Sequence, residues 1–540
     1  MRSRHAGAII ALLAGALGCG PKAPAQPPAR AEAPRPAAQA AAAQPADPIG
    51  PRPELPEPRP FTPPAPVVLD GPNGAKVWLL ERHTLPVVSV SIAVSSGSAD
   101  DPRGAAGLAH ITADMLDEGA GQRNAVELSS AINDLGATLS VGARADGSVA
   151  SLSVLKKNFA KAFSILADVV ARPRLEAREW QRVSGLWQND LRKRGDDPTR
   201  VSSLVSAAAL FGPGTPYGHP VEGLLADARS IGLPAVKAFY KAAWRPDRAV
   251  IAVVGDITRD EVMQAVSHDL GAWSAKGAPA SAAPAARGAA ASATPGAQPS
   301  ASPGAQPGKG ATAGAPAAAA APSWKPPRLV LVDRPGAPQS VIAVVREGVA
   351  ASDPRRPLLQ LINTALGGSF TSRLNQNLRE DHGWSYGAAS AFNETRQPGA
   401  FVARASVVAE ATGPALKEML AELAKMADSG LTRDELAKVQ AQDRADLVSA
   451  YETVNRTALR FGTLARLTLP ETFDATASQA RQKATLAGLA ELARAVDPKG
   501  ATIVVVGPRQ EILPQLQAIG LGEPEAWDVE GQPIQPNKAP

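Results

Sequence analysis

One stretch of the sequence places groups that could bind a metal ion at the spacing of a helix face. The segment GLAHITADM contains His110 and, four positions later, Asp114. On an α-helix these two side chains share a face, and Ala113 lies beside them. This is the arrangement in which a helix presents two metal ligands and an adjacent general base. Because alanine cannot accept a proton, the pattern lacks the base that zinc-assisted hydrolysis needs.

A second group of candidate residues lies late in the chain. Arg379 and Tyr386 are seven positions apart and follow the glycine-containing segment LGGSFTSRL at residues 366–374. A guanidinium donates a fork of N–H groups to carbonyl or carboxylate oxygens, and a phenol adds a donor on an apolar ring. Either residue alone would be an ordinary surface arginine or packed strand tyrosine. Chemically, such a pair can donate hydrogen bonds to a peptide.

The elements that position these residues alternate between strands and helices. Apolar residues recur at helical spacing in 108–115 and again in 159–170, and 124–127 resembles a capping box at a helix start. Residues 139–154 alternate at the period of a strand around an Asp-Gly turn. The order strand, helix, helix, hairpin, helix predicts an α+β fold, in which helices cover one face of a mixed or antiparallel sheet.

The chain contains two such blocks. VSVSIAV at 88–94 matches SVIAVV at 340–345, and AVIAVVG at 249–255 matches ATIVVVG at 501–507. Both pairs are about 252 residues apart, which predicts an internal duplication. The alternative is that these are unrelated buried strands.

Composition excludes several classes of protein. Hydrophobic residues make up 44% and charged residues 20% of the 540 positions, as in globular proteins and unlike fibrous or disordered ones. A net charge of +5 is small for this length and argues against a nucleic-acid partner. Cys19 is the only cysteine, which excludes internal disulfides and thiolate metal clusters. Apart from His110, the histidines are scattered, and we expect structural roles for them.

The first residues resemble an export signal. Arg2 and Arg4 precede an apolar run at 6–17, and Cys19 follows it. The cysteine at the cleavage position resembles a lipobox, whose cysteine becomes the lipidated N-terminus; the alternative is a plain secretory signal. We therefore expect an exported lipoprotein of the bacterial cell envelope, attached to the outer membrane and facing the periplasm.

Runs rich in proline, alanine and glycine divide the remaining chain, because such runs cannot form a core. We predict a lipoprotein signal peptide at 1–19, a Pro/Ala-rich tether at 20–66, a first domain at 67–275, a linker at 276–324, a second domain at 325–523 and a tail at 524–540.

Taken together, the first block resembles the pitrilysin/insulinase family of inverted-zincin metallopeptidases, whose zinc helix carries His-x-x-Glu-His. The resemblance rests on residues 104–119, on PYGHP at 216–220 and on WRPD at 244–247, and it extends over about 67–522. It implies two homologous, metallohydrolase-like domains in a clam-shaped arrangement.

This chain departs from the family at the zinc site. His110 stands at the first ligand position, Ala113 at the position of the base and Asp114 at the second ligand position. The family's third ligand, a glutamate, is missing from the corresponding stretch, where Asp190 is the only carboxylate. These residues could form at most a weak, carboxylate-rich site, since catalytic zinc needs three protein ligands. We interpret His110, Ala113 and Asp114 as degenerate metal-site positions and expect this chain to bind no cofactor.

In the same family, an arginine and a tyrosine at the spacing of Arg379 and Tyr386 contact the substrate. In some members one subunit holds the zinc while the other holds this pair. The resemblance therefore implies a non-catalytic, substrate-binding subunit of a heteromeric peptidase, inactive alone. Its partners would be a homologous zinc-bearing subunit, an unstructured peptide and, through the N-terminal lipid, a membrane. Two alternatives remain: a peptidase that acts alone through an atypical metal site, and a peptide-binding or scaffold lipoprotein without a protease partner.

Overall fold

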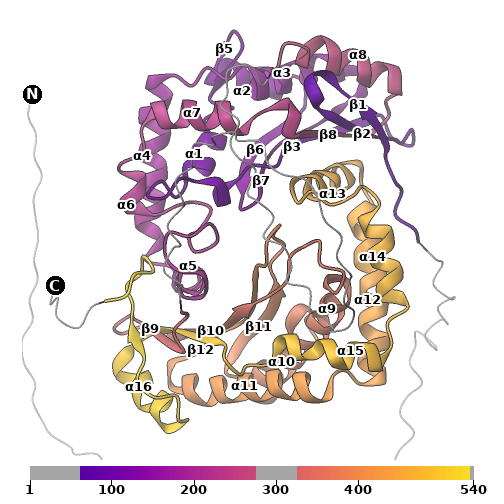
Figure 1. The fold of residues 1–540 in the computed structure, drawn as a ribbon. Helices are drawn as coiled ribbons and strands as arrows, with labels where there is room; N and C mark the ends of the chain where they lie inside the picture. The colour runs from indigo at the N-terminus through magenta and orange to yellow at the C-terminus, as the bar shows by residue number, and fades with distance from the viewer. Residues whose placement is uncertain (1–60, 275–324, 535–540) are drawn as a thin grey trace, which may run out of the picture. The chain divides into compact units, whose positions relative to one another are not determined.

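The computed structural model describes residues 61–274 and 325–534. The predicted signal peptide with Cys19, the predicted tether up to residue 60 and the predicted linker lie outside these ranges. The described residues form two blocks, and each contains a six-stranded sheet (Figure 1). Within the described ranges, no helix has both the length and the apolar character that a membrane crossing needs.

The sheet of the first block is mixed. Its strands, in spatial order, are β1 (Val67–Asp70), β2 (Lys76–Glu81), β8 (Ala249–Gly255), β3 (Val87–Val94), β7 (Gly147–Leu155) and β6 (Thr138–Arg144). Only β2 and β8 run parallel, and the other neighbours are antiparallel. The expected hairpin is the β6–β7 pair.

The sheet of the second block repeats this topology over five strands and differs at one edge. Its strands, in spatial order, are β14 (Glu525–Ala526), β9 (Leu329–Asp333), β13 (Thr502–Gly507), β10 (Gln339–Glu347), β12 (Ala400–Val408) and β11 (Ser385–Phe392). β9 runs parallel to β13, and β10 is antiparallel to both β13 and β12. At the edge that differs, β14, from the end of the chain, runs parallel to β9. The repeated sequence segments fall on equivalent strands, β3 with β10 and β8 with β13.

Helices cover one face of each sheet, as the sequence predicts. The first block contains α1 (Leu108–Asp114), α2 (Ala125–Asp134), α3 (Phe159–Ala171), α4 (Ala177–Arg194), α5 (Pro198–Phe211), α6 (Leu225–Ala228), α7 (Leu233–Ala243) and α8 (Arg259–Leu270). The second contains α9 (Arg356–Asn363), α10 (Arg373–Asn375), α11 (Thr412–Ser429), α12 (Arg433–Tyr451), α13 (Val454–Arg466), α14 (Phe473–Gln482), α15 (Leu486–Leu492) and α16 (Arg509–Ala518). The predicted α+β class is therefore confirmed.

The other face of each sheet is covered by a helix from the opposite block, which the sequence analysis did not predict. Helix α13 packs against β3 and β8 of the first sheet, and α5 packs against β10 and β13 of the second (Figure 1). Each central strand therefore buries both of its faces: on β3, Ile92 joins the core of its own block and Ala93 joins the core under α13. This accounts for the near-continuous apolar runs in these strands.

A glycine lets α13 approach its sheet closely. A Cβ at Gly462 would lie 2.1 Å from the hydroxyl oxygen of Ser91 on β3. A second link between the blocks lies at Asp146, where the backbone N–H of Arg396 donates to the carboxylate over 3.0 Å. The two blocks are thus joined by packed helices and by a buried ion pair between Arg396 and Asp146.

The last described residues pack on the second sheet, although the sequence analysis assigned them to a tail. Strand β14 pairs with β9, and the Trp527 side chain is buried beside α5. Glu530 accepts a hydrogen bond from Arg194 at the end of α4, over 2.8 Å. The described part of 524–540 is therefore part of the folded body.

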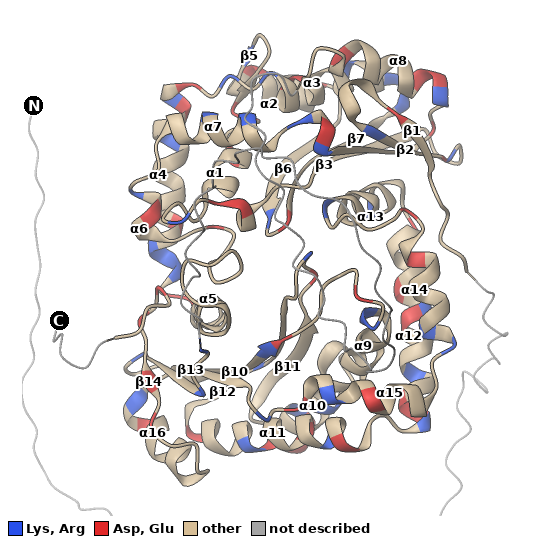
Figure 2. Ribbon diagram, in the orientation of Figure 1, with Lys and Arg blue, Asp and Glu red and all other residues tan. Residues whose placement is uncertain are grey.

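Basic and acidic residues are interspersed along the outer helices, for example α4, α11 and α12 (Figure 2). Neighbouring charges of opposite sign account for much of this pattern, as in the Arg182–Glu179 and Arg481–Asp443 pairs. The described helices in this view therefore form no extended surface that carries charge of only one sign.

Candidate functional site

Helix α1 is held at its N-terminus by a carboxylate and a glycine. Asp101 accepts the backbone N–H groups of Gly107 and Ala109, each over 2.8 Å. Gly107 has a φ of 96°, and a Cβ there would lie 2.7 Å from the indole of Trp187 on α4. The left-handed conformation and this contact both favour glycine. The backbone of α1 is thereby fixed against α4.

The structure brings two of the predicted metal-site residues together on α1. His110 Nε2 lies 3.3 Å from Asp114 Oδ2, and the two side chains are 25% and 36% exposed. Ala113 does not share their surface: it is fully buried in the core of the first block. The sequence analysis placed Ala113 beside the polar pair, whereas the helix turns it toward the core. The base position therefore lies in apolar surroundings.

The third predicted carboxylate has another partner. Asp190, on α4, forms an ion pair with Arg200 on α5, with an Oδ2–Nη2 distance of 2.9 Å. The hydrogen bonds from Arg200 lower the pKa of Asp190. Within the described residues, no three His, Cys, Asp or Glu side chains are grouped so that they could hold a metal ion. The donors around His110 therefore do not fit a catalytic zinc.

Several carboxyl groups near α1 are half-buried, and their partial burial is the largest influence on their pKa values. It raises the pKa of Asp101 to about 7 and that of Asp117 to about 6. It also raises the pKa of Asp114, where the charge of His110 opposes the effect. A proton on these oxygen atoms would compete with a cation for them.

The predicted substrate-binding pair lies on the second block and is exposed. Arg379 belongs to a π-helical turn at Gln376–Asp381, and its guanidinium lies 4.3 Å from the centre of the Phe370 ring. Glu380 contacts the same guanidinium at 3.3 Å. Tyr386 is 91% exposed, which excludes a ring packed into the core. Both side chains are accessible to a ligand.

A β-bulge determines which face of the sheet Tyr386 lies on. In the β11–β12 ladder, Ser385 pairs with Val407 and Ala388 with Ala405, so one extra residue of β11 lies between these pairs. Val407 and Ala405 both face the core of the second block. Tyr386 therefore lies on the opposite face, which is the face that α5 covers further along the sheet.

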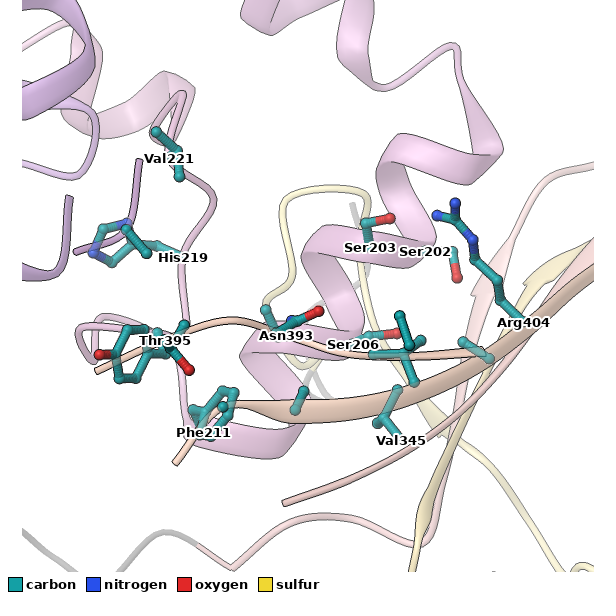
Figure 3. Close-up of a pocket in the computed structure, with 18 of the residues that line it drawn as sticks. Ser202, Ser203, Ser206, Phe211, His219, Val221, Val345, Asn393, Thr395 and Arg404 are labelled. Carbon is teal, nitrogen blue, oxygen red and sulfur yellow. The ribbon is translucent and has the colours of Figure 1, made fainter. Parts of the chain in front are cut away.

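A cavity of about 430 Å³ lies on this same face, between α5 and strands β10, β11 and β12 (Figure 3). Its walls combine apolar side chains with hydroxyl groups, and Arg404 of β12 reaches into it. This cavity was not predicted from the sequence. Alternation along β12 places Ala400, Val402 and Arg404 on one face, and a lone arginine in such a strand was the available signal.

The four other histidines that the structure describes do not converge on a site. His219 is buried at the edge of the cavity, where burial lowers its pKa, and His382 stacks on Trp384 with ring centres 4.1 Å apart. His83 lies between Asp256 and Glu81, and His268 is beside Asp269.

Two family models match the chain. The model described as "Insulinase (Peptidase family M16)" matches residues 76–212, and the model described as "Peptidase M16 inactive domain" matches residues 230–442. Together they cover about two thirds of the chain. The chain belongs to the pitrilysin/insulinase family. The peptidase model of this family spans α1, so Ala113 and Asp114 depart from the family pattern within a segment that is otherwise recognisable.

Proteins with similar sequences agree with this family assignment. An uncharacterized zinc protease of Mycobacterium leprae is 25% identical over 391 residues, which is 72% of this chain and 80% of that protein. An uncharacterized zinc protease of Bacillus subtilis is 21% identical over 390 residues, 72% and 85% of the two chains. A mitochondrial-processing peptidase subunit beta of Dictyostelium discoideum is 26% identical over 199 residues, 36% of this chain and 42% of that one.

Solved structures show the same fold. A peptidase M16 inactive domain from Pseudomonas fluorescens matches with a TM-score of 0.68 and 24% identity, covering 82% of this chain and 98% of that one. A protease from Helicobacter pylori matches with a TM-score of 0.69 and 17% identity, covering 83% and 100%.

Proposed function

We propose that this insulinase-family chain is a non-catalytic, substrate-binding subunit of an exported, heteromeric zinc peptidase. One observation carries the proposal: the base position, Ala113, is buried in the core of the first block, whereas Arg379 and Tyr386 stand exposed on the second. Among the described residues, the second block exposes side chains that can hold a peptide, and the base position of α1 has no proton acceptor.

The first block cannot supply the hydrolytic step by itself. Peptide hydrolysis by a zinc-bound water needs a metal with an open position and a base that takes the proton of that water. Ala113 has no proton acceptor, and Asp190 is already paired with Arg200. A homologous partner subunit with an intact His-x-x-Glu-His helix would provide both functions, and zinc would be bound there rather than by this chain.

The second block supplies the groups that hold substrate. The Phe370 ring and Glu380 restrain the Arg379 guanidinium, so less rotational freedom is lost when it binds a peptide carbonyl or carboxylate. The Tyr386 hydroxyl is free to donate to the same segment. Such contacts position a peptide bond for attack without touching the metal.

The first block offers an extended peptide a second place to bind. Strand β6 lies at the end of its sheet, and helix α1 packs beside it. The outer edge of β6 pairs with no other strand among the described residues. An unpaired edge provides backbone donors and acceptors for an added strand. An unstructured peptide is the substrate class that can adopt this conformation.

The comparisons support a role as a subunit. One relative is named as a subunit of mitochondrial-processing peptidase, and a chain of Complex III2 from Candida albicans shares the fold with a TM-score of 0.63. The fold therefore occurs in multi-subunit assemblies.

Export and lipid attachment are part of the proposal. Cys19 follows an apolar run and two arginines, as in bacterial lipoproteins, and it lies outside the described residues. We expect Cys19→Ser to release the protein from membranes of its bacterial host, as measured by fractionation and detergent partitioning. Unchanged membrane association would mean that the cysteine carries no lipid.

The decisive experiment is purification of the tagged chain from its host, followed by metal analysis and an assay on an unstructured fluorogenic peptide. We expect the isolated chain to contain no stoichiometric zinc and to cleave nothing, and the co-purifying zinc subunit to restore cleavage. About one zinc per isolated chain with chelator-sensitive cleavage would establish the autonomous peptidase instead. Peptide binding without any protease partner would establish the scaffold.

A further inference from the structure

The cavity between α5 and the second sheet has a chemically uneven lining. Most of its wall is apolar and comes from both blocks, including Phe211 of the first and Val345 and Val402 of the second (Figure 3). Among the described residues that line it, Arg404 is the only one with a permanent charge, and none is an aspartate or glutamate. The cavity therefore combines an apolar interior with one cationic group.

Arg404 is not used elsewhere in the fold. It is exposed, and within the part of the chain that the structure describes it has neither a hydrogen-bond nor an ion-pair partner. Most other arginines near the blocks' contact are paired, as Arg396 is with Asp146 and Arg200 with Asp190. A guanidinium that lines a cavity and is unpaired among the described residues is available for an anion.

Hydroxyl groups complete the polar side of the cavity. Figure 3 shows Arg404 reaching from β12 toward Ser202 and Ser203 of α5. Deeper in the lining, Ser206 is only 5% exposed, and its hydroxyl has no hydrogen-bond partner among the described residues. Buried hydroxyls are nearly always hydrogen-bonded, so an unsatisfied one lining a cavity indicates a missing polar partner.

We propose that this cavity binds a carboxylate of a peptide, with Arg404 as its ion-pair partner and the apolar wall around an adjoining apolar side chain. A carboxylate matches the planar fork of a guanidinium and accepts hydrogen bonds from serine hydroxyls. The volume lies in the range of about 300–1,000 Å³ that is common for ligand pockets. The carboxylate comes either from the C-terminus of the peptide or from an internal Asp or Glu.

The cavity lies in line with the proposed substrate contacts. Arg404 pairs in register with Ala389 of β11, and Tyr386 lies on the same face of the sheet, beyond the bulge. Tyr386 and Ala389 are three positions apart along β11, a span of roughly 10 Å, so a short peptide segment can reach the side chains of both Tyr386 and Arg404. This inference rests on the proposed peptide-binding function and adds the chemical class of residue that the site selects.

The test is the affinity of the purified full-length chain for labelled unstructured peptides, measured by fluorescence anisotropy. Three peptides differ only in charge: one with a free C-terminal acid, one with a C-terminal amide, and one with an amide and an internal Glu. We expect one of the acidic peptides to bind about ten- to a hundred-fold more tightly than the neutral one, as charge-assisted hydrogen bonds predict. The preferred acidic peptide identifies the source of the carboxylate.

Arg404→Gln should abolish this preference, and Arg404→Lys should retain part of it, because lysine keeps the charge but not the fork. Arg433→Gln, at an exposed position at the start of α12, removes one positive charge elsewhere and serves as the matched control. Circular dichroism and melting temperature check that each variant folds. Equal affinity of the wild-type chain for acidic and neutral peptides, or an unchanged preference in Arg404→Gln, would overturn the assignment.

A small probe separates this inference from the proposed function. The carboxylate 4-methylvalerate should bind the wild-type chain more tightly than its neutral amide, and Arg404→Gln should lose the difference, as measured by calorimetry. Binding of this acid without binding of any peptide would leave the cavity assignment standing and contradict the peptide-binding function. Peptide binding that depends on Arg379 and Tyr386, without any effect of Arg404, would leave the function standing and overturn the cavity assignment.

Discussion

The two blocks share a sheet topology, yet they differ in what they leave exposed. In the first, specific contacts fix the position of α1: Asp101 accepts backbone N–H groups at its start, and Gly107 packs tightly on Trp187. Its reactive position is nevertheless an alanine in the core. In the second, Arg379 and Tyr386 are accessible. The contacts that fix a helix can therefore be kept where its base position holds an alanine, and their presence alone is no evidence of activity.

The strongest test of this difference between the blocks is to restore a base at position 113. Ala113→Glu places a carboxylate in the fully buried core of the first block, and we expect it to lower the free energy of unfolding by about 2–5 kcal/mol. Asp114→His, one position later on the partly exposed face, should cost less than about 1 kcal/mol. Urea denaturation measures both. A stable Ala113→Glu variant that gains zinc would show that α1 still contains a usable site.

The next largest effect concerns the second block. Arg379→Ala should reduce the activity of the complex with its zinc subunit by about ten- to a hundred-fold, because it removes a charge-assisted hydrogen bond to substrate worth about 1.5–3 kcal/mol. Tyr386→Phe should reduce it by about two- to tenfold, because a neutral hydrogen bond is worth about 0.5–1.5 kcal/mol. Melting temperature and partner affinity should hardly change, since both side chains are exposed. Full activity of the double variant would reject substrate binding, and loss of folding would indicate a structural role.

A smaller effect tests how the blocks are joined. Gly462→Ala brings a methyl group against the Ser91 hydroxyl, and we expect a loss of about 1–3 kcal/mol in the free energy of unfolding. Ser91→Ala removes that oxygen, so the double variant should be less destabilised than the sum of the two single changes. Additive losses would mean that α13 shifts away from β3 instead. Gly185→Ala on α4 is the matched control, because a Cβ there meets no other atom within 4 Å. Gly136→Ala would be a poor control, because Gly136 has a φ of 59°, which strains other residues.

Whether a feature of this fold can be predicted from the sequence depends on whether it arises within one segment or from contacts between segments that are far apart in the chain. The strands at residues 88–94 and 249–255 could be predicted from the sequence. Each is a near-continuous apolar run, and such a run indicates a buried strand. The packing of α5 and α13 on the sheet of the opposite block could not be predicted. Helical periodicity shows that a helix has an apolar face, but it does not show which sheet that face packs against.

The candidate site was predictable to the same degree. Arg379 and Tyr386 match a motif of the pitrilysin/insulinase family, so their positions could be inferred from that resemblance, and their roles remain predictions. Arg404 belongs to no motif and becomes visible only when the register of β12 places it over the cavity. Ala113 was expected beside His110 and Asp114, and only the packing of α1 shows that it faces the core.

The two blocks should also respond to acid with opposite signs. Near α1, burial raises the pKa of Asp101 to about 7, against an unfolded value near 4. Between these pH values the folded state binds the extra proton, so its stability is greatest below about pH 4 and is lost as pH rises through 7. In the second block, the pKa of Glu435 is lowered to about 2: burial opposes this shift, and hydrogen bonds from Arg373 and Thr432 outweigh it. Stability from this pair is present above about pH 4.5 and is lost as pH falls toward 2.

Variants at each carboxylate separate the two contributions. Between pH 5 and 7, Asp101→Asn should flatten the dependence of the unfolding free energy on pH by up to about 1.4 kcal/mol per pH unit, the value for one proton. Glu435→Gln should leave that slope unchanged and reduce stability chiefly above pH 4.5, by an amount that solvent screening of this partly exposed pair limits. Urea titrations at pH 3, 5, 6 and 7 measure both slopes. If Asp101→Asn keeps the wild-type slope, the carboxylate that anchors α1 is ionised in the folded protein. Its two backbone N–H bonds would then outweigh burial, and α1 would be anchored by a charge rather than by a neutral acid.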